Sequence, residues 1–196
     1  MGTFRTILLG TAASVLAAGA AQAAPVFFAD NGHYYEYVGI ASSFDEALIA
    51  ASAASYNGLQ GYLATVTSQA EQDFIYNSVT VSQIWLAGTD RDVEGTWAWV
   101  AGPEAGTVFW QNGSTLTYAN WNGGEPNNSG NEDFLQGNWS GSRWNDTGVG
   151  TRIGYVIEYG GLESAVPEPA SWAMMIGGLA FVGGAMRRRR TAVSFA

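Results

Sequence analysis

The sequence contains no cysteine, and His33 is its only histidine. Without cysteine the fold can have neither a disulfide bond nor a thiol nucleophile, and the redox compartment of the protein is left open. A single histidine with no serine or aspartate partner in an identifiable motif also argues against a catalytic triad. We therefore interpret His33 as a structural or edge-strand residue rather than as a catalyst or a metal ligand.

Positive charge is scarce in the central part of the chain. Residues 24–166 contain 3 Arg and no Lys, against 16 Asp and Glu. Proteins bind nucleic acids and anionic membrane surfaces through basic patches that neutralise phosphate groups, and this segment cannot form such a patch. The composition excludes nucleic acid as a partner and is instead typical of a surface that binds cations.

Apolar segments lie near both ends of the chain. Residues 1–23 combine Arg5, an alanine-rich stretch and the small-residue cleavage site Ala21-Gln22-Ala23, which is typical of a secretory signal peptide. Residues 170–186 form an uncharged, mostly apolar run of 17 residues, at the short limit for a membrane-spanning helix. Four arginines follow at 187–190 and predict that this end of the helix stays on the cytoplasmic side.

Residues 24–165 are enough chain for one domain, and their pattern predicts a loop-rich fold with two helices. Each helix starts with a capping box of the form S-x-x-E, at Ser43–Glu46 and at Ser68–Glu71. We expect the first helix to end at Asn57-Gly58, and residues 62–66 to be a buried extended segment.

Beyond residue 80 the sequence changes to short strands and turns that glycine punctuates. Residues 101–149 are predicted to be a long irregular region, which is unusual unless the loop has a function. Near the start of the domain, the aromatic run at residues 33–37 predicts the first strand. Aromatic residues must supply much of the core, because each large ring buries on the order of 150–250 Å².

Five oxygen-bearing side chains stand out within the irregular region: Glu125, Asn127, Glu132, Asn145 and Asp146. Carboxylate and amide oxygens are the ligands that Ca²⁺ prefers. In an extended segment, residues two apart point to the same side, so Glu125 and Asn127 can face one ion. Because Glu carboxylates accept hydrogen bonds and Asn amides donate them, the same side chains could also hold two neighbouring hydroxyls of a sugar.

The motifs Glu125-Pro126-Asn127 and Trp144-Asn145-Asp146 resemble those of a C-type lectin-like domain. The resemblance extends from Phe28 to Tyr159 and includes, in order, the segments 61–66, 85–90 and 154–159. It implies an α+β fold with two helices, small antiparallel sheets and a long calcium-binding loop region. It also implies a cis peptide bond before Pro126.

The resemblance further implies that the five oxygen-bearing residues bind both Ca²⁺ and sugar. In this family the E-P-N motif implies sugars with equatorial 3- and 4-hydroxyls, such as mannose, glucose, N-acetylglucosamine or, through equivalent hydroxyls, fucose. An auxiliary calcium site is implied at Asp90, Glu94, Glu132 and Asp133. There Asn128 replaces the usual aspartate and removes one negative charge. A solvated acidic loop face is the alternative interpretation of this second group.

The family's two structural disulfides would join positions near Ala51 and Ile157, and positions near Phe134 and Val149. All four positions hold apolar residues. We expect packed side chains to replace the cross-links, since a disulfide stabilises a protein by about 2–4 kcal/mol and a buried large apolar side chain by about 1.5–3 kcal/mol.

Three tryptophans near the predicted ligands in sequence, Trp121, Trp139 and Trp144, could stack against a sugar. In this fold tryptophans are more often core anchors, and we favour the core for all three. Trp144 in particular is expected to pack inward.

The C-terminal segment Val166-Pro167-Glu168-Pro169, the apolar run and the arginine cluster together resemble the PEP-CTERM sorting signal of Gram-negative bacteria. The resemblance implies an exosortase that removes the tail. A permanent single-span anchor is the alternative.

The predicted organisation is a signal peptide at 1–23, a C-type lectin-like domain at 24–165, a sorting signal at 166–190 and a cytoplasmic tail at 191–196. Membrane contact is predicted only through the sorting helix. The protein is expected to be exported to the cell envelope, the cell surface or the extracellular space of a Gram-negative bacterium.

Three classes of function fit these patterns. The first is calcium-dependent carbohydrate binding, at the cell surface or in exopolysaccharide. The second is a structural or protein-binding domain that keeps the fold and does not bind sugar. A glycosidase needs only two carboxylates, but here the acidic residues already belong to a calcium motif, so we predict that the protein is not an enzyme.

Overall fold

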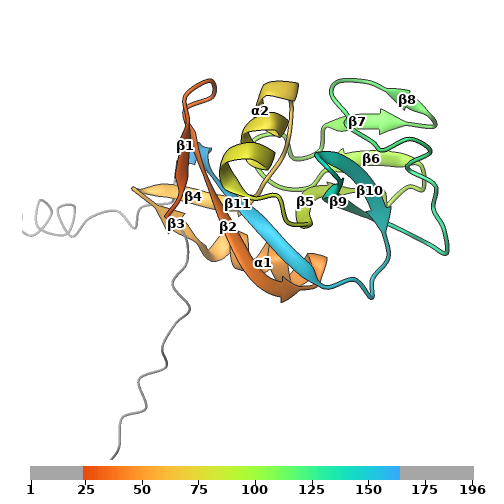
Figure 1. Ribbon diagram of the computed structural model, residues 1–196, viewed down its shortest axis with the longest axis horizontal. Coiled ribbons are helices and arrows are strands. Elements are labelled where there is room, and N and C mark those ends of the chain that lie inside the picture. The colour runs from red at the N-terminus through yellow and green to blue at the C-terminus, as the bar shows by residue number, and fades with distance from the viewer. Residues whose placement is uncertain (1–23, 164–196) are drawn as a thin grey trace, which may run out of the picture.

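The computed structural model describes residues 24–163. The predicted signal peptide, sorting signal and cytoplasmic tail lie outside these residues. Two helices pack against a mixed sheet, which confirms the predicted α+β class (Figure 1). Within the described part of the chain, neither helix combines the length and the apolar content that a membrane crossing requires.

The sheet runs in the order β1-β2-β11-β5-β6-β7-β8, with β4 and β3 joined through β11, and with β9 and β10 joined through β5. Strands β11 and β5 are parallel, and the other pairs are antiparallel. Helix α1 spans Phe44–Ala53, and helix α2 spans Gln69–Phe74 and continues into a π-helical turn at Ile75–Val79. The strands are β1 Val26–Phe28, β2 His33–Ser42, β3 Ser55–Tyr56, β4 Leu59–Leu63, β5 Ile84–Thr89, β6 Thr96–Trp99, β7 Val108–Gln111, β8 Ser114–Thr115, β9 Phe134–Ser140, β10 Arg143–Thr147 and β11 Ile153–Glu163.

Helix α1 begins as predicted and ends earlier than predicted. The Ser43 side chain accepts from the backbone of Glu46, and the Glu46 carboxylate accepts from the backbone of Ser43, so the capping box is complete. The helix ends at Ala53, four residues before Asn57. Asn57 and Gly58 have φ angles of 50° and 79°, and they form the two-residue turn between β3 and β4, because both positions of such a turn require positive φ.

The second predicted capping box is only half formed. Ser68 caps the backbone N–H of Glu71 at 3.2 Å, but the Glu71 carboxylate does not return to Ser68. It is buried instead, where it accepts from the Tyr35 hydroxyl at 2.5 Å and from the Thr67 backbone at 2.8 Å. Helix α2 is therefore tied to the core of the protein through its first turn.

Two further predictions about the strands need correction. The aromatic run that starts at His33 opens β2, and β1 precedes it as its antiparallel partner. The region 101–149 contains β7, β8, β9 and β10, so the segment without regular strands or helices narrows to residues 116–133. Short antiparallel hairpins therefore give much of this region a regular structure.

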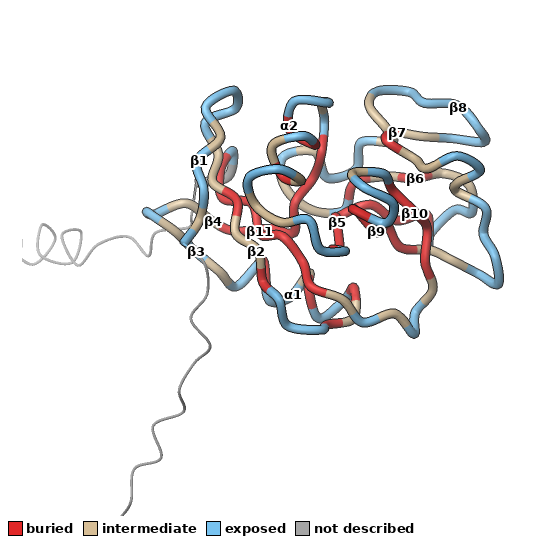
Figure 2. Tube along the Cα trace, in the orientation of Figure 1, coloured by how far each residue is buried: buried red, intermediate tan, exposed pale blue. Residues whose placement is uncertain are grey.

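Buried apolar side chains occupy three of the four positions at which the family has its two disulfides. Phe134 is buried and stacks on Phe44, with ring centroids 4.7 Å apart. Ala51 and Ile157, the other predicted pair, are both buried in the core. Figure 2 shows that buried segments run along the central strands β11 and β5. Val149 is 74% exposed, so the prediction of a packed apolar pair at that site is wrong.

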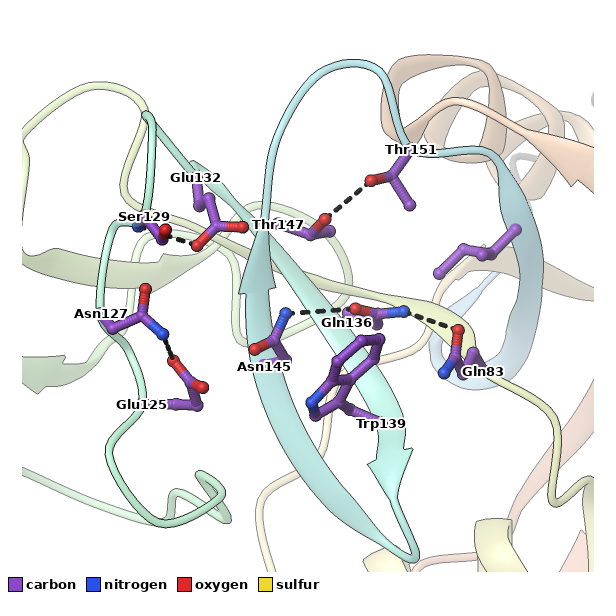
Figure 3. A pocket seen from close by; sticks show the side chains of 11 residues that line it. Gln83, Glu125, Asn127, Ser129, Glu132, Gln136, Trp139, Asn145, Thr147 and Thr151 are labelled. Carbon is purple, nitrogen blue, oxygen red and sulfur yellow. Dashed lines mark hydrogen bonds between the residues drawn. The ribbon is translucent and has the colours of Figure 1, made fainter.

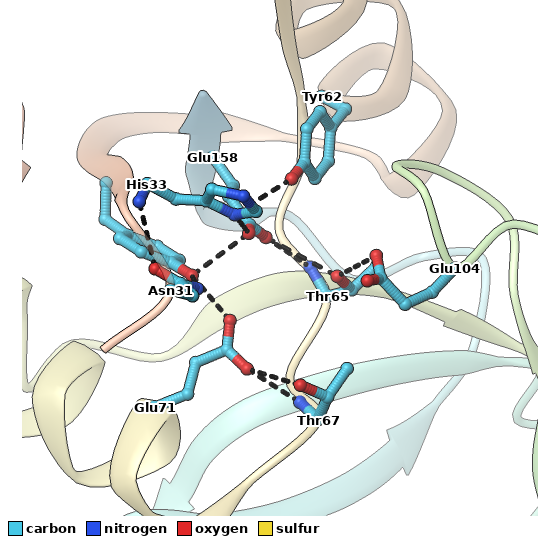
Figure 4. Close-up of polar contacts among 9 residues, drawn as sticks. Asn31, His33, Tyr62, Thr65, Thr67, Glu71, Glu104 and Glu158 are labelled. Carbon is cyan, nitrogen blue, oxygen red and sulfur yellow. Dashed lines mark hydrogen bonds and ion pairs between the residues drawn. The ribbon is translucent and has the colours of Figure 1, made fainter. Parts of the chain in front are cut away.

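A buried polar network joins β2, β11 and α2 (Figure 4). His33 Nδ1 lies 2.6 Å from Glu158 Oε1, which also accepts from the Tyr35 hydroxyl at 3.0 Å. Glu158 Oε2 accepts from the Thr65 backbone at 3.2 Å. The contact with Glu158 gives His33 a structural role in this network, as the sequence predicted.

Both described ends of the chain leave the fold beside β1 and β3, at one end of the molecule (Figure 1). Strands β9 and β10 lie in the opposite half of the molecule.

Candidate functional site

Trp144 anchors the strand that carries two of the predicted ligands. It is fully buried on β10, and its indole N–H donates to Gln72 Oε1 of α2 at 2.6 Å. The rings of Trp99 and Phe109 pack edge-on against it. The prediction that Trp144 points inward is confirmed, and its fixed position orients the next two residues along the strand.

The loop of residues 116–133 is held against β10 by backbone hydrogen bonds. Trp144 N–H donates to the Asn120 carbonyl at 2.9 Å, and Asn122 N–H donates to the Trp144 carbonyl at 2.8 Å. Further along the loop, Asn128 N–H donates to Asp146 Oδ2 at 2.7 Å. The Glu125-Pro126 bond is cis, as the resemblance implied.

Four of the five predicted principal ligands line one pocket of about 450 Å³ (Figure 3). Glu125 and Asn127 come from the loop, Glu132 from its end and Asn145 from β10. Asn127 donates its amide N–H to Glu125, and Ser129 N–H donates to Glu132 at 2.9 Å. The full lining is Gln83, Glu125, Asn127, Ser129, Glu132, Gln136, Trp139, Asn145, Thr147, Thr151 and Ile153.

The fifth predicted ligand, Asp146, is fully buried, and its Oδ1 has no hydrogen-bond partner. Burial raises the pKa of Glu125, and the neighbouring carboxylates of Asp146 and Glu132 raise it further. Burial, together with the Asp146 charge, also raises the pKa of Glu132. A cation bound here would offset the crowded carboxylates and the unpaired buried oxygen, so the chemistry of this set of residues fits Ca²⁺.

The carboxylates alone do not make a metal centre. Across residues 24–163, no group of three His, Cys, Asp or Glu side chains is arranged to hold a metal ion. The predicted set combines carboxylates with the amides of Asn127 and Asn145, which is the mixture of oxygen ligands that Ca²⁺ accepts.

The predicted auxiliary site lies where β5 ends. Asp90 is 3% exposed, its Oδ2 accepts from Gly95 N–H at 2.9 Å, and its Oδ1 has no partner. Burial, with the charges of Glu94 and Asp133, raises the pKa of Asp90 to about 6. Asn128 turns its side-chain oxygen to the backbone of Glu132 at 2.8 Å. An orphaned carboxylate oxygen among like charges is again compatible with a cation.

The pocket extends beyond the residues that the motifs identified. Gln83, Gln136 and Trp139 line its other part. Trp121 packs against the core and Trp144 lies within it, as predicted, but Trp139 is 46% exposed, so the core prediction is wrong for this tryptophan.

A bulge in the β9–β10 hairpin explains the position of Trp139. Asn138 has a φ of 56°, and three residues of β9 face a single residue of β10 at this point. A bulge breaks the alternation of sides along a strand, so Gln136 and Trp139, three residues apart, line the same pocket. The turn sequence Ser140-Gly141-Ser142 was the only signal of a hairpin tip here, and it does not reveal the bulge.

Two family models match the chain. Residues 50–156 match the Lectin C-type domain, and residues 165–190 match the PEP-CTERM protein-sorting motif. Halomucin of Haloquadratum walsbyi is 46% identical over 136 residues, which are 67% of this chain and 2% of halomucin. The low affinity immunoglobulin epsilon Fc receptor of Mus musculus is 38% identical over 45% of this chain and 23% of the receptor. The chain thus spans a small part of the curated relatives that it matches.

The fold is that of solved C-type lectins. The C-type carbohydrate-recognition domain of cow CD23, solved in the presence of a GlcNAc2Man3 oligosaccharide, is 25% identical to the chain and superposes with a TM-score of 0.54. The match covers 68% of this chain and 91% of that domain. Lectins of this family bind carbohydrates and are not enzymes. The chain belongs to the C-type lectin domain family, and it carries a PEP-CTERM sorting motif at its C-terminal end.

Proposed function

We propose that the protein binds carbohydrate in a calcium-dependent manner, with Glu125, Asn127, Glu132, Asn145 and Asp146 as the ligands of the principal ion. One observation carries the proposal: four of these side chains meet in one pocket, and Asp146 is buried with an unpaired oxygen. The ion, when bound, would supply a Lewis acid that attracts the hydroxyl oxygens of a sugar. The Glu125 carboxylate and the Asn127 amide would accept and donate the hydrogen bonds that orient those hydroxyls.

We propose sugars of the mannose and glucose type as ligands. The E-P-N motif supports this choice, and the cow CD23 domain with the same fold was solved with a mannose-containing oligosaccharide. The variant Glu125→Gln with Asn127→Asp exchanges the acceptor and the donor and should shift preference toward galactose. A glycan-array profile that stays the same in this variant would contradict the assignment of these two residues.

Asp90, Glu94, Asn128, Glu132 and Asp133 are proposed to hold an auxiliary ion. The unpaired Oδ1 of buried Asp90 supports this second site. Calorimetric titration should then give two calcium ions per chain for the parent protein and one for Asp90→Asn. A single ion in both proteins would restrict calcium to the principal site.

Thermal unfolding with calcium, with a chelator, and with calcium plus mannose tests the principal site. A ligand that binds only the folded state at 100 times its dissociation constant stabilises it by about 2.7 kcal/mol. The parent protein should melt higher in calcium and higher again with sugar. Asp146→Asn is the matched variant, because an amide oxygen can still accept from Asn128 N–H while the charge is removed, and it should lose both shifts.

A structural or protein-binding domain is the alternative to the lectin proposal. The hydrogen bonds of Asn127 with Glu125 and of Ser129 with Glu132 support this alternative, because these residues also bond to one another. A parent protein whose melting temperature does not change with calcium would favour this alternative. A response to calcium without any response to sugar would favour it too, with the ion in a structural role.

We further propose that the lectin domain, residues 24–165, is exported and acts at the cell surface or in exopolysaccharide. The predicted signal peptide at 1–23 and the matched sorting motif support this location, with an exosortase as the processing partner. Mass spectrometry of the protein from a host with and without exosortase should show loss of the tail only when the enzyme is present. An intact tail in both hosts would support a permanent anchor.

A further inference from the structure

Trp139 is the one exposed tryptophan of the described residues, and its indole lies at the edge of the pocket. Trp139 is 46% exposed, and among the tryptophans of residues 24–163 it is the only one without a ring–ring contact. A large aromatic side chain left in water at the edge of a pocket is a common feature of ligand sites.

The position of Trp139 is nevertheless fixed by the strand that carries it. The side chain of its neighbour Asn138 is 4% exposed and donates to the carbonyls of Thr80 and Ser82 at 2.9 and 3.0 Å. Gln72 of α2 donates to the Asn138 amide oxygen at 3.4 Å. The bulge that turns Trp139 into the pocket is thus held from two other parts of the fold.

A chain of amides leads from the proposed calcium site toward this part of the pocket (Figure 3). Asn145 Nδ2 donates to Gln136 Oε1 at 3.3 Å, and Gln136 Nε2 donates to Gln83 Oε1 at 3.0 Å. Apart from Glu125 and Glu132, the residues that line the pocket carry no charge. Amides and hydroxyls beside an indole can offer hydrogen bonds to hydroxyl groups and an apolar face to the C–H side of a pyranose ring.

We propose that Trp139, Gln136 and Gln83 form a second sugar subsite, so that the pocket takes a neutral glycan segment of at least two sugar rings. This inference rests on the proposed function, which places the first ring at Glu125 and Asn127. The pocket volume of about 450 Å³ lies within the range of roughly 300–1,000 Å³ found for drug-sized ligands. It thus has room for a ligand larger than one ring.

Affinity as a function of chain length tests the second subsite. The full chain, kept in a detergent without a sugar headgroup, is titrated in calcium with mannose, linear mannotriose, N-acetylglucosamine and its β-1,4 trisaccharide. For at least one of the two sugars, the parent protein should bind the trisaccharide more tightly than the monosaccharide. Trp139→Ala should weaken trisaccharide binding roughly three- to tenfold and leave monosaccharide binding unchanged.

Two further variants control this experiment. Trp139→Phe keeps an aromatic face and should retain much of the gain with the trisaccharide. Leu116→Ala removes a side chain of similar exposure, 54%, that does not line the pocket, and it should behave as the parent protein does.

The outcomes separate this inference from the proposed function. A parent protein that binds both monosaccharides and trisaccharides with equal affinity overturns the second subsite and leaves the lectin proposal standing. An equal loss for both chain lengths in Trp139→Ala also overturns it, because the indole would then belong to the first subsite. A parent protein that binds none of the four sugars overturns both proposals.

Discussion

The side chain of Gln72 links Trp144 of β10 with Asn138 of β9, the residues next to Asn145 and Trp139 of the pocket. It is 1% exposed, accepts from the Trp144 indole at 2.6 Å and donates to Asn138 at 3.4 Å. Gln72→Leu leaves both partners buried without these hydrogen bonds. Because a buried polar group without a partner costs about 1–3 kcal/mol, the free energy of unfolding should fall by roughly that amount in a denaturant titration.

A double variant separates the hydrogen bond from the packing. Removing both partners of a buried hydrogen bond can be nearly neutral, so Gln72→Leu combined with Trp144→Phe should be less destabilised than the sum of the two single variants. Exact additivity would mean that the indole N–H contributes nothing through Gln72. The unfolding free energies of all four proteins are measured at one calcium concentration, because Trp144 also positions two proposed calcium ligands.

At the scale of single residues, the sequence predicted which polar residues line the pocket better than it predicted which tryptophan does. The grouping of Glu125, Asn127, Glu132 and Asn145 was predictable because recognisable motifs contain residues with the oxygen atoms that a calcium site needs. These four residues line one pocket. Their binding of calcium and sugar stays a prediction. Trp139 was not predictable, since its side of the strand depends on the bulge at Asn138.

Strand β5 lies at the centre of the sheet and is buried along its whole length. All six of its residues are buried, and it pairs with β6, β9 and β11. At Gly88 a Cβ atom would lie 2.7 Å from Leu135 Cδ2 and 3.2 Å from Phe109 Cζ. Gly88→Ala should lower the free energy of unfolding by about 1–3 kcal/mol, the usual cost of overpacking a core.

Gly150→Ala is the matched control for this strand. A Cβ atom at Gly150 would meet no atom within 4 Å, and a surface change of this kind usually stays within about 0.5 kcal/mol. Chemical denaturation of the two variants under one set of conditions makes the comparison. Equal stability of the two would show that Leu135 and Phe109 can move aside.

At the scale of elements, the sequence predicted a boundary correctly where a local side-chain hydrogen bond sets it. The prediction failed where contacts with strands distant in the sequence set the boundary. The start of α1 was predicted because Ser43 and Glu46 complete a local capping box. Its end was missed, since Asn57 and Gly58 serve a hairpin whose second strand, β4, is fixed by pairing with distant β11. The half-formed box of α2 has the same origin, because Glu71 bonds across the core to Tyr35.

On the scale of the whole molecule, the network around His33 makes stability depend on pH. The imidazole faces Glu158 of β11, with Tyr62 of β4, Glu71 of α2 and Glu104 nearby. The hydrogen bond to the Glu158 carboxylate, opposed by burial and reinforced by the negative charges, raises the pKa of His33 above its usual 6.5. Folding therefore favours the protonated imidazole.

The sign of the effect follows from this raised pKa. The stabilisation is complete below about pH 6.5 and is lost as the pH rises through the pKa of the folded state. Burial also raises the pKa of Glu71. This shift also makes the free energy of unfolding fall as the pH rises, and its effect begins at a lower pH than that of His33. His33→Gln should cost roughly 1.5–3 kcal/mol at pH 6, the value of a hydrogen bond to a charged group, and less at pH 9.

Denaturant titrations of the parent and His33→Gln proteins at pH 6, 7, 8 and 9 measure this effect. The two curves of unfolding free energy against pH should converge as the pH rises. Parallel curves would show that His33 does not titrate in the network.

The positions of the two described chain ends determine which way the pocket would face in a tethered molecule. Both described ends leave the fold beside β1 and β3, while the hairpin of β9 and β10 that bears part of the pocket lies in the opposite half of the molecule (Figure 1). A molecule tethered by its C-terminal side would hold the pocket away from its support, and neighbouring copies would share this outward orientation. A long polysaccharide could then bridge several tethered copies, and its residence time would grow with their crowding even if each contact were weak.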